Sequence, residues 1–279
     1  MYLSLLPVRV DNYPSRQWLG KLYRVHQRLW MAFPDAQRRQ EDPFFLGTWE
    51  GPAAADQKPK RCRAGFLFRI ERDGHPRILV QSAQKPDWGY AFQNAPYLLA
   101  DEPRIRQFDP APSRDKSYRF RLLANVVSSK SVAHPNGRMR TTGSGLTIRC
   151  RKRTEIPVFP EPIPDPLPTD PLERRQVLLA RWNPWRMWLG RIASGRGFRV
   201  IDEEASPLLM EAVHTIVRNP GKGRADANQD EPTQKRYNAG LFEGVLVCTD
   251  SDLLRDALIN GVGHGKAFGF GLLSIAPVR

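Results

Sequence analysis

A histidine and a tyrosine one helical turn apart are the first side chains that could do chemistry. Tyr23, His26 and Trp30 are spaced three and four residues apart, so a helix would align them along one face. Histidine, with an unperturbed pKa of about 6.5, can take or give a proton near neutrality. Metal-free RNA cleavage needs one group to take the 2′-hydroxyl proton and another to protonate or neutralise the leaving 5′-oxygen. His26 and Tyr23 suit these roles; the alternative is a histidine at the core boundary without catalytic function.

A stretch of one charge sign supplies the clearest binding signal. Residues 116–153 contain ten Lys or Arg and no Asp or Glu, which favours a polyanionic partner; the alternative is a solvated basic face. Asn136-Gly137 within it is typical of a projecting hairpin. A second basic segment, 174–196, interleaves arginines with tryptophans, as in nucleic-acid binding by stacking, although Trp188, Leu189 and Ile192 also fit a core. The candidate RNA contacts of the first stretch are Arg119, Arg121, Lys130, Arg138, Arg140, Arg149, Arg151, Lys152 and Arg153.

Five glycines fall within residues 261–271, which we call the glycine-rich loop. Glycines this dense allow close backbone approach and expose N–H groups, so Gly263, Gly265 and Lys266 are candidate phosphate contacts. The alternative is a plain turn before a buried edge strand. The loop is not a P-loop, because Ala267 follows Gly265-Lys266 where Ser or Thr is required.

The elements that must position these residues follow a β-α-β-β-α-β order twice. Apolar patterns and turn signals predict a first set within residues 1–112 and a second within 116–279. This predicts an α+β protein of two tandem ferredoxin-like domains. The proline-rich 154–171 and the charged 219–236 are predicted to be loops. The first set comprises strand 2–10, helix 16–33 capped by Ser15, strands 65–71 and 77–84, a helical piece 87–99 and strand 104–108. The second set comprises strand 118–127, helix 172–194 split at Pro184 with Asn183 as cap, strands 198–202 and 239–249, helix 251–260 and strand 272–277.

Composition limits the partners and the compartment. The chain of 279 residues carries a net charge of +14 and has a pI of about 10.1, which favours nucleic acid as partner. Three widely separated cysteines give neither zinc spacing nor a disulfide framework, and no signal peptide or apolar span is present, so we expect a cytoplasmic protein without a membrane partner. Asp, Glu and His do not cluster at metal-ligand spacing, so we expect no metal and no other cofactor.

Several motifs, taken together and in order, resemble one known family. Leu22-Tyr-Arg-Val-His26-Gln-Arg-Leu-Trp30 is similar to the first helix of the CasE family, the CRISPR-associated endoribonucleases of the type I-E Cascade complex. The resemblance extends nearly from end to end. Its other parts are Phe66-Leu-Phe-Arg-Ile-Glu71, Leu79-Val-Gln-Ser82 with Pro86-Asp-Trp88, Tyr118-Arg-Phe-Arg121 with Ala124-Asn125, Trp188-Leu-Gly-Arg-Ile-Ala193 with Gly197-Phe198, Phe242-Glu-Gly-Val-Leu246 and the glycine-rich loop with residues 272–277.

The resemblance implies a fold, an activity and partners. CasE proteins have two ferredoxin-like domains, bind the stem-loop of each CRISPR repeat in precursor RNA, and cut at the 3′ base of the stem without metal. They stay on the crRNA 3′ stem-loop as a Cascade subunit beside the other Cascade subunits. The family's catalytic histidine falls on His26 and its assisting tyrosine on Tyr23, while its basic hairpin falls within 138–153. The chain departs from the family pattern at Val126, where a proline often follows Ala124-Asn125, and in the expanded loops near 51–60, 154–171 and 219–236.

We therefore expect a metal-independent CRISPR RNA-processing endoribonuclease, with catalytic residues His26 and Tyr23. The rival hypothesis is a non-catalytic subunit of the same kind of complex that holds the stem-loop without cutting it, and a weaker one is a basic scaffold for other anionic partners. The expected RNA-binding residues are Arg28, Arg119, Arg121, Lys130, Arg138, Arg140, Arg149, Arg151, Lys152, Arg153, Gly263, Gly265 and Lys266.

Overall fold

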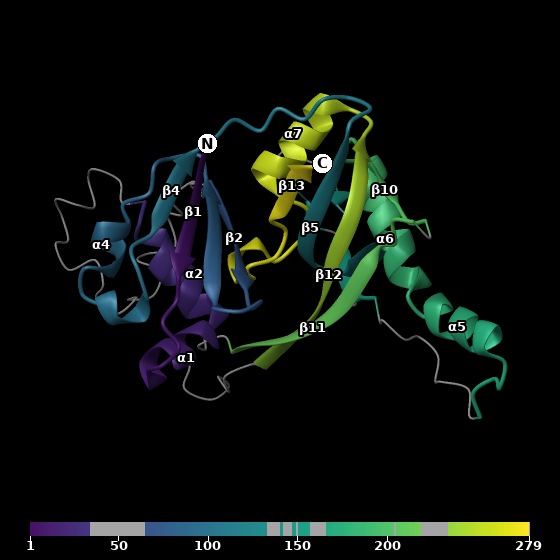
Figure 1. Cartoon of the computed structure of the whole chain (residues 1–279), viewed down its shortest axis with the longest axis horizontal. Coiled ribbons are helices and arrows are strands. Elements are labelled where there is room, and N and C mark those ends of the chain that lie inside the picture. Colours follow the sequence, from purple (N-terminus) through teal and green to yellow (C-terminus); the bar gives the residue numbers. More distant parts are fainter. Residues whose placement is uncertain are drawn as a thin grey trace.

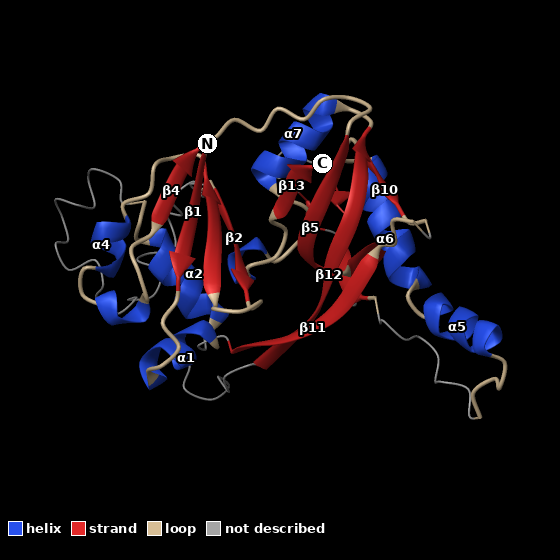
Figure 2. Ribbon diagram, viewed as in Figure 1, coloured by secondary structure: helices blue, strands red, loops and turns tan. Residues whose placement is uncertain are grey.

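The computed structural model describes residues 1–33, 65–132, 140–141, 147–148, 150–156, 166–203, 205–218 and 234–278. Two antiparallel sheets, one from each half of the chain, stand side by side in Figure 1. The linker between them, residues 108–116, crosses the top of that view. Figure 2 shows α1, α2 and α4 beside the N-terminal sheet and α6 beside the C-terminal one, with α7 near the top of this view.

The N-terminal sheet has the ferredoxin-like arrangement, with the first and third strands in its centre. Its order is β2-β3-β1-β4, and all neighbours are antiparallel. The strands are β1 (Tyr2–Pro7), β2 (Phe66–Glu71), β3 (Arg77–Ser82) and β4 (Arg104–Gln107); the helical elements are α1 (Tyr13–Leu19), α2 (Leu22–Trp30), α4 (Trp88–Phe92) and the 3-10 turn η1 (Pro96–Leu98).

The single helix predicted over 16–33 is two helices. Asn12, not Ser15, caps α1, since its side chain accepts a hydrogen bond from the Ser15 amide at 2.8 Å. Gly20 ends α1 and Lys21 precedes α2. Glycine is a poor helix former, and the break lets the two helices take different directions over the sheet. The residues of α2 that bury against the domain core are Val25 and Leu29.

The C-terminal sheet repeats this arrangement with the order β10-β12-β5-β13. Its third strand is much longer than predicted, because β12 begins at Gln234, inside the segment expected to be a loop. The alternating strand β11 was not predicted; it pairs with β12 from Leu209 to Arg218. The strands are β5 (Ser117–Asn125), β10 (Phe198–Ile201), β11 (Leu209–Arg218), β12 (Gln234–Cys248) and β13 (Leu273–Pro277), and the helical elements are α5 (Pro171–Ala180), α6 (Asn183–Ser194), α7 (Ser251–Asn260) and the 3-10 turn η2 (Lys266–Phe268).

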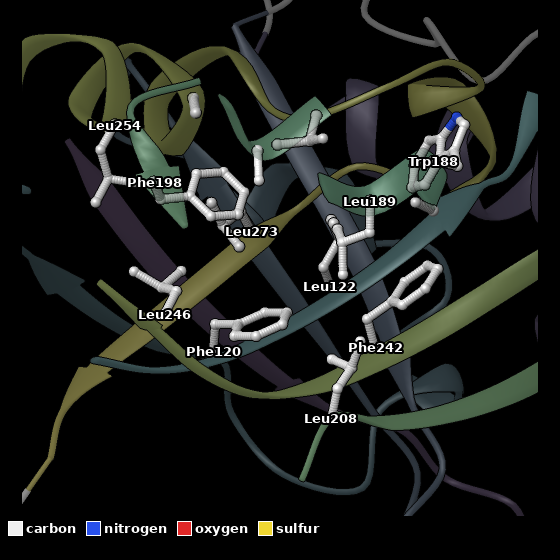
Figure 3. Packing of buried hydrophobic residues seen from close by; sticks show 14 of the residues in the cluster. Phe120, Leu122, Trp188, Leu189, Phe198, Leu208, Phe242, Leu246, Leu254 and Leu273 are labelled. Atoms are coloured by element: carbon white, nitrogen blue, oxygen red, sulfur yellow. The ribbon is translucent and has the colours of Figure 1, made fainter. Parts of the chain in front are cut away.

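The helices α6 and α7 cover one face of this sheet and close its core. Figure 3 shows Phe120, Phe198 and Phe242 packed among leucines and Trp188. The predicted break between 172 and 194 is confirmed, but Trp182 rather than Asn183 precedes α6, without a side-chain cap. None of the residues of α5 is buried, and the helix projects away from the domain in Figure 1.

A basic two-stranded ribbon leaves the sheet directly after β5. β6 (Val127–Val132) pairs with β9 (Cys150–Glu155), and β7 (Arg140–Thr141) pairs with β8 (Thr147–Ile148). We call these four strands the basic ribbon. Its base is held on α6 by two indole N–H groups: Trp185 donates to the Ile156 carbonyl at 3.0 Å and Trp188 to the Val127 carbonyl at 3.1 Å. The hairpin predicted around Asn136-Gly137 falls on residues 133–139, which lie outside the described part of the chain, and so it stays a prediction.

Buried charges join the two sheets. Arg69, 3% exposed, donates to Glu71 at 2.6 Å and to the carbonyls of Arg121 and Leu272 at 3.0 and 2.9 Å. Arg121 donates in turn to the other Glu71 oxygen at 2.6 Å, and it pairs with Glu243 at 2.8 Å and with Asp73. We call these five residues the ionic cluster. Because β2 of one sheet and β5 and β12 of the other all contribute, the ionic cluster fixes the sheets to each other.

Candidate active site

Helix α2 presents His26 to the aromatic side chains of β2. The imidazole is stacked on Phe66, with ring centroids 5.3 Å apart and an interplanar angle of 26°, and on Phe68 at 6.2 Å and 23°. Trp30 meets it edge-on at 5.6 Å. We call Phe66, Phe68 and Trp30 the aromatic stack. The half-buried ring therefore has apolar neighbours on the side that faces the sheet.

Burial changes the proton chemistry of this histidine. Desolvation lowers the pKa of His26 from 6.5 to about 4, since the charged imidazolium loses water without gaining a partner. Its Nδ1 atom is buried and accepts or donates no hydrogen bond among the described residues. His26 is thus neutral at pH 7 and able to accept a proton at its other nitrogen. This is the state that a general base requires.

Tyr23 lies one turn before His26 on α2 and is half-buried. The predicted helical spacing is thus confirmed, and the two side chains share one helix end. The helix also reaches the other domain at this point, because Leu22 is buried with Tyr237, Ala239 and Phe270 of the C-terminal half. The pair consequently lies where the two domains meet.

The glycine-rich loop packs against α2 through η2. Gly263 and Gly265 have φ angles of 78° and 83°, a conformation that glycine adopts without strain. The Val262 amide donates to the Gly271 carbonyl at 2.8 Å, and Lys266 Nζ donates to the Asn260 carbonyl. The structure thus brings the loop, with Gly263, Gly265 and Lys266, beside the helix that carries His26.

A family model describing a CRISPR-associated protein matches residues 1–277 of the chain. The chain belongs to this family. The CasE resemblance is thereby confirmed. The "CRISPR-associated endoribonuclease Cse3" of Thermus thermophilus is 27% identical over 99% of this chain and all of that protein, and the "CRISPR system Cascade subunit CasE" of Escherichia coli is 26% identical over the full length of both. A solved structure of Cse3 bound to a 19-nucleotide RNA has a TM-score of 0.58 at 25% identity, covering 99% of this chain and 100% of that one. The tandem ferredoxin-like fold is confirmed by this likeness and by the two strand orders.

The ribbon of this CRISPR-associated protein concentrates like charges. Lys130 and Lys152 are directly opposed across the β6–β9 pair, beside Arg151 and Arg153. Arg140 is placed on β7. Arg138 and Arg149 lie outside the described residues.

Three other predicted RNA contacts lie elsewhere. Arg28 donates to the Ala91 carbonyl at 3.0 Å and to the Asn94 side chain at 2.9 Å, so its guanidinium is engaged by the end of α4 and the residues just after it. Arg119 is exposed on β5, and Arg121 belongs to the ionic cluster. Both line a hollow of about 580 Å³ between the two sheets, whose lining does not include His26. The roles of all three in RNA binding stay predictions.

The structure decides one alternative that the sequence left open, and it shows residues that the sequence analysis did not predict. Trp185 and Trp188 are 0% and 3% exposed, so they belong to the core and do not offer faces for stacking. Trp30 of the aromatic stack was expected beside His26, but Phe66 and Phe68 were missed, although their alternation places both on one strand face. The ionic cluster was missed too; its signal is the charged pair Arg69 and Glu71 within an otherwise apolar strand.

The part of the chain that the structure describes contains no group of three or more His, Cys, Asp or Glu side chains that could hold a metal ion. None of its helices combines the length and apolarity needed to cross a bilayer.

Proposed function

We propose that this CasE-family protein is a metal-independent endoribonuclease for CRISPR precursor RNA. It binds the repeat stem-loop, cleaves at the 3′ base of the stem and stays on the product as a subunit of a Cascade complex in the cytoplasm. The observation that carries the proposal is the neutral, half-buried His26 on α2, at the place where the two domains and the glycine-rich loop meet. The relatives named as an endoribonuclease and as a Cascade subunit support it.

The proposed reaction is an internal transfer of the phosphate. Neutral His26 takes the proton of the 2′-hydroxyl, and the 2′-oxygen attacks the adjacent phosphorus. The bond to the 5′-oxygen of the next nucleotide breaks, and that oxygen takes up a proton. Tyr23 orients the reacting groups or assists a proton transfer, and Lys266 and the basic ribbon hold the phosphates. The products are a 2′,3′-cyclic phosphate and a 5′-hydroxyl.

Two further assignments belong to the proposal. We assign residues 1–112 to the domain that carries the catalytic helix. Residues 116–279 form the domain that carries the basic ribbon and the glycine-rich loop. The two sheets, from 2–107 and 117–277, support this division.

Cleavage without metal is the first expected result. A labelled RNA that contains the cognate repeat should be cut once in EDTA, and the upstream product should carry a 2′,3′-cyclic phosphate. A matched RNA with a 2′-deoxy nucleotide at the cut should bind equally and stay intact. Binding without cutting of the all-ribose RNA would favour the rival hypothesis of a non-catalytic stem-loop subunit. Cutting only after Mg²⁺ is restored would contradict metal independence.

Charge reversal in the basic ribbon should weaken RNA binding. The double variant Arg151→Glu/Lys152→Glu changes two residues of β9. Because released counterions drive binding, each lost phosphate contact should reduce the slope of log K against log salt by about 0.7 to 0.9. The measurement is a salt titration of stem-loop affinity. Arg104→Glu/Arg106→Glu, on the exposed strand β4 of the other domain, makes the same charge change as a control. Equal losses in both variants would contradict a specific role of the ribbon.

A further inference from the structure

The rings that surround His26 form a closed apolar wall. Phe66 is 8% exposed and Phe68 is fully buried, and both lie nearly parallel to the imidazole, at 26° and 23°. Phe33 is also stacked on Phe66, with ring centroids 5.2 Å apart, so the Phe66 ring is itself held by a neighbouring ring. Movement or hydration of the imidazole on this side therefore requires displacement of core aromatic rings, which are close-packed.

The glycine-rich loop touches the same wall from the other domain. Gly269 has a φ of 82°, and a Cβ placed on it would lie 3.1 Å from Cε2 of Phe68. The loop is fixed to the C-terminal sheet, since the Gly271 amide donates to the Leu123 carbonyl at 2.7 Å. The backbone at Gly269 therefore rests on the ring that lies behind His26.

Charged neighbours do not account for the state of the ring. Burial is the sole cause of the lowered His26 pKa, although several elements packed on α2 carry ionisable groups. Among the described side chains these groups are Tyr13 and Arg16 on α1, Tyr90 on α4, Glu211 on β11 and Lys266 on η2, beside Tyr23, Arg24 and Arg28 on α2 itself. The apolar wall, rather than a charged neighbour, therefore sets the proton affinity of His26.

We propose that Phe66 and Phe68 are positioning residues for His26, which fix the plane and the hydration of the imidazole. We infer that the glycine-rich loop acts on His26 through Phe68. The inference rests on the proposed role of His26 in cleavage. It gives the loop a second task besides phosphate contact: Gly269 keeps Phe68 seated behind the histidine, so the C-terminal domain helps to hold the catalytic side chain of the N-terminal one.

The variant Phe66→Leu tests the wall directly. Water should reach the imidazole, and the His26 titration of the RNA-free protein should move upward by at least about half a pH unit. NMR of the histidine side chains measures this titration, and the spectrum of His26→Gln identifies the His26 signal. Single-turnover cleavage at pH 8 should fall about 10-fold or more because the base is no longer oriented. The pH at which the cleavage rate falls on the acid side should rise together with the His26 titration, and RNA affinity should stay unchanged.

Two controls separate positioning from general destabilisation. Phe92→Leu removes a ring of the same core that does not contact His26, so it should lower stability without moving the His26 titration or the rate. Phe66→Tyr keeps the stacked ring and should restore both readouts. If Phe66→Leu does not fold, Phe66→Met fills more of the volume and carries the same test.

The loop has its own matched pair of variants. Gly269→Ala and Gly74→Ala both place a side chain at positive φ, but nothing lies within 4 Å of a Cβ at Gly74. Only Gly269→Ala should therefore shift the His26 titration and slow cleavage. An unchanged titration in both Phe66→Leu and Gly269→Ala, or unchanged cleavage at pH 8 despite a shift, overturns the inference. Cleavage that survives His26→Ala overturns the proposed function instead, whatever the titrations show.

Discussion

Replacing His26 with alanine should lower the single-turnover rate of repeat cleavage in EDTA by about 100- to 10,000-fold, the usual contribution of a general base. The stem-loop affinity should stay within a few fold, because the half-buried imidazole is neutral at pH 7 and gives no charge to the RNA. The rate and the affinity are measured on the same labelled repeat, so loss of chemistry and loss of binding are separated.

The controls for this prediction use the same helix. Gln27→Ala changes the adjacent half-buried residue of α2 and should leave the rate within a few fold. His26→Gln keeps most of the side-chain volume but cannot act as a base near pH 7, so it should be as slow as His26→Ala. Tyr23→Phe should slow cleavage less if the tyrosine only assists. Undiminished cutting by His26→Ala would remove His26 from the mechanism.

The lowered pKa of His26 also determines whether folding stability rises or falls with pH. The ordinary pKa of histidine is 6.5 and that of folded His26 is about 4, so the unfolded chain binds more protons between these values. The contribution of His26 to folding stability is therefore fully present above pH 6.5 and decreases as the pH falls toward 4. The His26→Ala variant should lose this part of the acid sensitivity. Denaturant unfolding of both proteins at pH 7 and pH 5 measures the difference.

Neutralising Glu71 should have the largest effect on stability. Its carboxylate accepts from Arg69 at 2.6 and 2.8 Å and from Arg121 at 2.6 Å, and its residue is 6% exposed. In Glu71→Gln the shape is kept, but the Arg69 guanidinium remains buried without its counter-charge. Removing one partner of a buried ion pair lowers the free energy of unfolding by about 3 to 5 kcal/mol. Urea unfolding at pH 7 measures the loss.

Asp73→Asn is the matched control for Glu71→Gln. Both changes remove a carboxylate that pairs with Arg121, but the Asp73 side chain is 65% exposed. Solvent screens exposed pairs, so the control should cost less than about 1 kcal/mol. Because Arg69 also donates to the Leu272 carbonyl directly after the glycine-rich loop, Glu71→Gln should in addition slow cleavage. A stability loss equal to that of the control would contradict the central place of Glu71 in the ionic cluster.

Local patterns were sufficient where one side chain decides the local backbone. The predicted helix 251–260 is α7, and Asp250 caps it by accepting hydrogen bonds from the Asp252 and Leu253 amides. Apolar patterns and turn signals predicted the two β-α-β-β-α-β sets. The break at Gly20 was missed because the apolar stripe continues across it at helical spacing.

What the sequence alone determined, then, is the succession of elements, the charge of the ribbon and the position of His26 one turn after Tyr23. Only the tertiary structure decided the state of these residues. Arg121 belongs to a basic stretch in the sequence but meets Glu71, Asp73 and Glu243 in the fold, because strands distant in sequence bring carboxylates to it. His26 is an ordinary helical histidine in the sequence, and in the fold it is stacked on the rings of β2, where burial removes its water. Desolvation and ion pairing depend on groups that are far apart along the chain, which is why spacing could locate the candidate base but not its proton affinity.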